Sequence, residues 1–157
     1  MSLYVLAFLI GVIAGLRSLT APAVVSWAAG LGWLHIENTG LAFLGYARTR
    51  YLLSVLAIVE LVADKLPGTP SRKAPASFAA RLVTGGLCGA TFGAAGQSLI
   101  GGLLAGIIGS TVGTLGGHEF RVRLVKAIGG KDLPIALAED VIALGAALLI
   151  ARTMSVL

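Results

Sequence analysis

The stretch RSLTAP, Arg17 to Pro22, separates two apolar runs at the start of the chain, residues 3–16 and 21–34. A helix of about fourteen residues is about 21 Å long, whereas the hydrocarbon core of a bilayer is about 30 Å thick. A proline inside a helix also removes a backbone hydrogen bond and clashes with the preceding turn. We therefore predict that residues 1–34 form two half-helices or a tightly bent hairpin, and that no straight helix covers them.

The composition of the whole chain is typical of a membrane protein. Of its 157 residues, 57% are hydrophobic and only 12% are charged, while soluble domains carry about 25% charged residues. No basic residue precedes the first apolar run, which argues against a cleaved signal peptide. We predict an all-α, polytopic membrane helix bundle with five to six apolar segments, the first of them broken. It would be a single domain, residues 1–157, in the bacterial inner (plasma) membrane.

The basic residues predict the orientation of this bundle. Further spans are expected at residues 51–66, 77–95, 97–117 and 133–151, with connectors at 35–50, 67–76 and 118–132. If the two central spans cross, the connectors 67–76 and 118–132 share a side that holds seven basic residues, against three on the other side. The richer side should be cytoplasmic. The net charge of +5 is explained by this topology, so no nucleic-acid partner is expected.

The two halves of the chain, residues 1–76 and 77–157, follow a similar plan. Each has a broken or hairpin-like pair, a basic connector, and a span that carries acidic residues. A register of 80 residues places Glu60 opposite Asp140, and Arg17-Ser18-Leu19 opposite Gln97-Ser98-Leu99. An odd number of crossings in each half would invert one half relative to the other, as in many transporters. The sequence therefore suggests an inverted repeat.

Acidic residues inside apolar segments are the first candidate functional residues. Glu60 and Asp64 share one helix face, and Glu60 is expected near the middle of its span. A carboxylate at that depth costs about 2.5–3.5 kcal/mol, so it should face protein or water. Together with Arg17, Glu139 and Asp140 they are candidates for transport or ion binding. The structural alternative for Asp64 is an ion pair with Arg81.

Arg17 is the deepest basic candidate, because it lies at the break in the first apolar segment. A broken helix frees backbone groups, which can bind an anion or a carboxylate. The alternative is an arginine whose head group extends to the membrane surface.

Glycines recur every four residues in three separate runs within the two central spans, and their helix faces should be flat. They are Gly85, Gly89, Gly93, Gly102, Gly106, Gly109, Gly113 and Gly117. Such spacing lets helix backbones approach closely. We interpret these glycines as packing positions, either within the chain or in a homo-oligomer, with a glycine-lined passage as the alternative.

The loop PGTPSRK is a candidate for phosphate or head-group contact through Ser71, Arg72, Lys73 and, nearby, Arg81. The alternative is a turn that carries cytoplasmic positive charges. The two histidines and the single cysteine form no metal-binding pattern, so no metal or cofactor is expected.

Three motifs carry a resemblance to a known family: GVIAGLRSLTAPA, ELVADKLPGTPSR and ARLVTGGLCGATFG. With them the chain resembles domain-of-unknown-function family 4126, small glycine-rich bacterial membrane proteins. The resemblance implies a membrane location and no established activity. A weaker similarity links Glu60, Asp64 and PGTPSR to motifs of undecaprenyl-pyrophosphate phosphatases. Here the loop holds an extra proline, Pro70, and adjoins the acidic pair.

Three functions remain open at this point. The first is passage of a small solute or ion, coupled to protons, through an acidic polar centre. The second is a membrane-embedded lipid-phosphate hydrolase with a divalent metal on Glu60 and Asp64. The third is a membrane scaffold or accessory subunit. The sequence favours transport over an enzyme, with membrane lipids as the surrounding partners.

Overall fold

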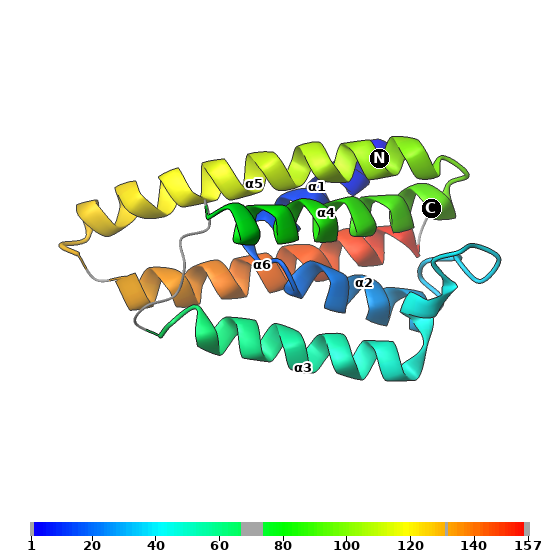
Figure 1. Ribbon diagram of the computed structural model, residues 1–157, viewed down its shortest axis with the longest axis horizontal. Coiled ribbons are helices and arrows are strands. Elements are labelled where there is room, and N and C mark those ends of the chain that lie inside the picture. The colour runs from blue at the N-terminus through cyan, green and yellow to red at the C-terminus, as the bar shows by residue number, and fades with distance from the viewer. Residues whose placement is uncertain (1, 67–73, 131, 156–157) are drawn as a thin grey trace.

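The computed structural model describes residues 2–66, 74–130 and 132–155, and in these ranges the chain is all-α with no strand. The helices are α1 (Leu3–Leu16), α2 (Thr20–Gly30), α3 (Ala47–Ala63), α4 (Pro75–Ala95), α5 (Leu99–Ala127) and α6 (Asp132–Met154), with a 3-10 turn, η1, at Ala42–Gly45. The long helices run nearly side by side, and both chain ends lie toward the same end of the bundle (Figure 1).

The first apolar segment is a helical hairpin, which confirms the predicted interruption. The α1 helix ends at Leu16, and Arg17 is extended, with φ −139° and ψ 108°. The α2 helix then runs back toward the end of the bundle from which α1 came (Figure 1). Pro22 does not break a helix, because it lies in the first turn of α2, where its missing N–H has no partner to lose.

One expected boundary is wrong. The span 97–117 was expected to end before a connector at 118–132, but α5 continues without a break through His118 to Ala127. This segment has no glycine or proline before Gly129, so nothing in it ends the helix earlier. The turn to α6 begins at Ile128 and includes Gly129 and Gly130, both with positive φ, a conformation that glycine adopts without strain.

The six helices form two groups. The α1, α4 and α5 helices pack closely together, whereas α2 lies between α3 and α6 and contacts both. In the proposed repeat α2 would correspond to α5, yet α2 has 11 residues and α5 has 29, and their packing partners differ. The inverted repeat therefore stays a prediction.

Glycines hold the first group together. A Cβ on Gly85, Gly89, Gly93, Gly102, Gly106, Gly109 or Gly113 would collide with an atom of a neighbouring helix or of the α4–α5 turn, in most cases a backbone atom. Gly89 and Gly102 face each other across α4 and α5, and Gly106 also meets Gly11 of α1. Gly117 is half-buried. The seven glycines are thus occupied by contacts within the chain and offer no free face to a second copy.

Two helices in the described ranges, α5 and α6, are long and apolar enough to cross a membrane. The helices α1 to α4 do not meet this test of length and hydropathy, so a bundle in which five to six apolar segments span the membrane is not confirmed. Large apolar side chains nevertheless lie on the surface of α3, α5 and α6, such as Val59, Ile100 and Leu149, while Arg17 is fully buried. Large exposed apolar surfaces of this kind mark contacts with a membrane or with another protein.

Candidate functional site: the hairpin tip

The tip of the α1–α2 hairpin, residues Arg17, Ser18 and Leu19, lies inside the bundle and not at its surface. Its hydrogen-bond and ion-pair partners come from α3, from α6 and from the segment that follows α3. Because helix ends leave backbone groups without intrahelical partners, a tip in this position needs partners from neighbouring helices.

Glu60 of α3 binds the backbone of the tip. Its Oε1 accepts hydrogen bonds from Ser18 N at 2.8 Å and from Ser18 Oγ at 2.5 Å, and its Oε2 accepts one from Leu19 N at 2.8 Å. These N–H groups precede the first turn of α2, where the helix dipole favours a negative charge. The anion that the broken helix was expected to bind is therefore a carboxylate of the chain itself.

We expect Glu60→Gln to lower the free energy of unfolding by about 1.5–3 kcal/mol, the range for hydrogen bonds to a charged group. Glutamine retains one acceptor oxygen, and its NH2 group would face a backbone donor of the tip. Unfolding in mixed detergent micelles measures the change. Glu37→Gln, in the exposed part of the loop before η1, is the control. Equal stability of the two variants would contradict a structural role for Glu60.

Arg17 is the charged centre of the site. Its side chain is fully buried and forms ion pairs with Asp64, just after α3, and with Asp140 of α6. Lys65 Nζ lies 2.6 Å from the other oxygen of Asp140 and also donates to the Leu61 carbonyl at 2.8 Å. Two cations and two carboxylates are thus in contact. The partner of Asp64 is Arg17, in place of the predicted Arg81.

Arg81 of α4 supports the other side of the tip. It is buried, and its Nη1 donates to the carbonyls of Gly15 and Leu16, both at 2.9 Å. Thr114 Oγ1 of α5 also donates to the Gly15 carbonyl, at 3.2 Å. These donors satisfy the last carbonyls of α1, which is a common use of arginine at a helix C-terminus. Arg81 thus contacts the inside of the bundle at this point; the predicted phosphate contacts Ser71, Arg72 and Lys73 lie outside the described residues.

Glu139 and its neighbour Asp140 point to different parts of the structure, since adjacent helical residues are about 100° apart. Asp140 faces the tip, whereas Glu139 pairs with Arg121 of α5 at 3.4 Å. Arg121 also binds Asp132 at 2.7 Å and 2.8 Å. Of the predicted acidic candidates, Glu60, Asp64 and Asp140 come together with Arg17, and Glu139 belongs to a separate contact between α5 and α6.

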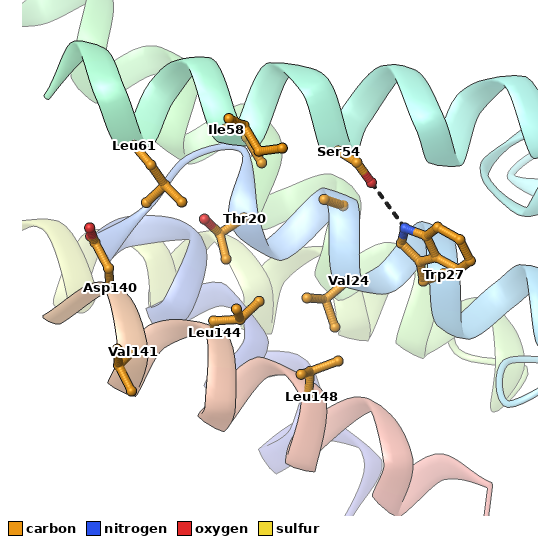
Figure 2. Close-up of a pocket in the computed structure, with 12 residues that line it drawn as sticks. Thr20, Val24, Trp27, Ser54, Ile58, Leu61, Asp140, Val141, Leu144 and Leu148 are labelled. Carbon is orange, nitrogen blue, oxygen red and sulfur yellow. Dashed lines mark hydrogen bonds between the residues drawn. The ribbon is translucent and has the colours of Figure 1, made fainter. Parts of the chain in front are cut away.

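A groove of about 340 Å³ leads away from the charged cluster between α2, α3 and α6. Asp140 and Thr20 line one end and Trp27 lines the other, with aliphatic side chains between them (Figure 2). Ser18, Thr20 and Lys65 were not predicted as site residues. Ser18 adjoins Arg17 in the break, so its position was the available signal. Thr20 and Lys65 had no such signal, because their surroundings depend on how the helices pack.

The geometry does not favour a divalent metal on Glu60 and Asp64. Glu60 already binds three donors of the tip, and Asp64 is paired with Arg17. Among residues 2–66, 74–130 and 132–155, no three His, Cys, Asp or Glu side chains converge in the manner of a metal site. The two carboxylates that the hydrolase hypothesis assigned to a metal are therefore already engaged in contacts within the chain.

The chain belongs to the family described as domain of unknown function (DUF4126), whose model matches residues 4–153. No curated protein and no solved structure matches the chain at a level that shows relatedness. The family match covers the hairpin, the charged cluster and the groove, and it carries no activity with it.

Proposed function

We propose that the protein is a multi-pass membrane protein that passes a small solute or ion, coupled to protons, through the polar centre at the hairpin tip. The exposed apolar surface of α3, α5 and α6 supports the membrane location, because a bilayer solvates it and water does not. Many transporters also bind substrate or ions where broken helices end inside the membrane.

The proposed orientation places the hairpin tip toward the cytoplasm. The last turns of α5 carry Arg121, Arg123 and Lys126, and this end of the bundle also holds the turn that leads into α6. The positive-inside rule assigns such an end to the cytoplasmic side of an inner membrane. Both chain ends would then lie on the opposite side (Figure 1).

One observation carries the proposal: the fully buried Arg17 is held by carboxylates from two different parts of the bundle. The side chains of Asp64, Asp140 and Lys65 are 18%, 12% and 23% exposed, whereas the side chain of Arg17 is fully buried. Proton binding to Asp140 would weaken its pairs with Arg17 and Lys65 and release α6 from the tip. The ion pairs of Asp140 with Arg17 and Lys65 are thus the proposed link between proton binding and movement of α6.

Proton flux into vesicles tests the proposal without knowledge of the solute. Purified protein would be reconstituted into liposomes that contain a pH-sensitive dye, and a potassium diffusion potential would drive protons inward. We expect flux above that of empty vesicles for the native chain and a return to the empty-vesicle level for Asp140→Asn. Glu119→Gln, at an exposed position of α5, should behave like the native chain. Native flux equal to that of empty vesicles, or unchanged flux in Asp140→Asn, would refute proton passage through the site at Asp140.

A further inference from the structure

We propose that the groove between α2, α3 and α6 binds the hydrocarbon chain of a lipid-like alcohol, with its hydroxyl group at Thr20 and Asp140. The inference rests on the proposed function in one respect, the location of this groove within the bilayer. It names the class of molecule that reaches the polar centre: an uncharged, single-chain amphiphile that enters from the membrane.

The walls of the groove suit an apolar chain. They are formed by Ala23, Val24, Ala57, Ile58, Leu61, Val141, Leu144 and Leu148, which contribute no hydrogen-bonding side chain. Ile58, Val141 and Leu144 are exposed at its rim, so the groove opens toward the surface that faces lipid in the proposed membrane location. Its volume of about 340 Å³ lies at the lower end of the range for ligand sites, about 300–1,000 Å³. An inorganic ion would gain nothing from such walls.

The polar end of the groove contains a hydroxyl without a partner. Thr20 is 4% exposed, lines the groove, and its Oγ1 makes no hydrogen bond within the described ranges. The oxygens of Thr20 and Asp140 lie at the same end of the groove (Figure 2). A buried hydroxyl that stays unpaired costs about 1–3 kcal/mol, which a ligand hydroxyl would recover. The threonine Oγ1 can both donate and accept, and Asp140 can accept.

The charges at this end favour an uncharged head group. Arg17 and Lys65 balance Asp64 and Asp140, so no net charge of the four is left for a phosphate or an ammonium group. A charged head would have to displace one of these pairs, and an unpaired buried charge is costly. A hydroxyl adds a hydrogen bond at Thr20 without disturbing them.

Trp27 offers a direct measurement, because it lines the apolar end of the groove and donates from Nε1 to Ser54 Oγ at 2.9 Å. The chain has two tryptophans, so Trp33→Phe leaves Trp27 as the only fluorophore of this type. The probe is a straight-chain alcohol with a brominated tail, added to nanodiscs of unbrominated phospholipid that hold the Trp33→Phe protein. The matched probe is its methyl ether, which lacks the donor hydrogen.

We expect the alcohol to quench Trp27 fluorescence saturably, and the ether to require about fivefold to tenfold more probe, the equivalent of one hydrogen bond. Thr20→Val keeps the shape of the side chain and should reduce this difference between the probes. Because the native hydroxyl is unpaired, this variant should fold, and a melting curve in detergent checks it. Ala57→Leu should reduce quenching by both probes, whereas Val55→Leu, exposed on α3 outside the groove, should not.

Several results would overturn the inference. Quenching that rises in proportion to the probe, or equal curves for alcohol and ether in the native background, would show random contact with lipid. No quenching at any probe concentration, with a dimer in sedimentation analysis, would show that a second copy of the chain covers the groove. The vesicle experiment is independent of this one. Absence of proton flux would refute the proposed function but not the binding of the alcohol, and absence of quenching would refute the binding of the alcohol but not the proton flux.

Discussion

Replacing Arg17 with methionine is expected to lower the free energy of unfolding by about 3–5 kcal/mol, the range for removal of one partner from a buried ion pair. Methionine fills part of the same volume but leaves Asp64 and Asp140 without their shared cation. Lys65 compensates only Asp140. Equilibrium unfolding in mixed detergent micelles measures the loss.

A second substitution shows whether the loss comes from charge. Adding Asp64→Asn to Arg17→Met removes the uncompensated carboxylate and should recover part of the stability, so the two effects should not add. Arg123→Met is the control, because Arg123 is 78% exposed and pairs with Glu119 one helix turn away; it should cost less than about 0.5 kcal/mol. A loss in Arg17→Met no larger than in this control would contradict the described ion pairs.

The break in the first apolar segment was predictable because it depends on local chemistry. Two runs too short to span a bilayer and a polar stretch between them are visible in the sequence, and so is the expectation that a broken helix binds a carboxylate. Which carboxylate binds which group was not predictable. Glu60 and Asp64 share a face, yet Glu60 binds the tip backbone and Asp64 binds Arg17. That division depends on the depth at which the hairpin tip meets α3, a property of the packed bundle.

The partners of Arg81 illustrate the same limit on what the sequence predicts. Arg81 was assigned from sequence to Asp64 or to a phosphate, because both would lie near one end of adjacent spans. The structure places Gly15 and Leu16 of α1 against Arg81, residues that are more than sixty positions away in the chain. Contacts of this kind follow from helix packing, which short-range patterns do not determine.

The glycine faces lead to the second large effect, a loss of packing in Gly106→Ala. A Cβ at Gly106 would meet the Gly85 carbonyl oxygen and the Gly89 Cα of α4, and α1 approaches the same turn through Gly11. Backbone atoms cannot move aside as a side chain can, so whole helices must separate. We expect a loss of about 1–3 kcal/mol or more in the free energy of unfolding, the range for overpacking, measured by unfolding in mixed detergent micelles.

Gly145→Ala separates this collision from the general effect of replacing a helical glycine. Gly145 is exposed within α6, and a Cβ there would meet no atom within 4 Å. Alanine should therefore stabilise the helix at this position by about 0.5–1 kcal/mol, because it loses less backbone entropy on folding. Alanine at Gly106 has the same entropic advantage. The Gly106→Ala variant therefore loses stability only if the collision costs more than this advantage. If both substitutions raise stability equally, α1, α4 and α5 do not pack through these glycines. Opposite signs are expected, because only Gly106 lies where three backbones meet.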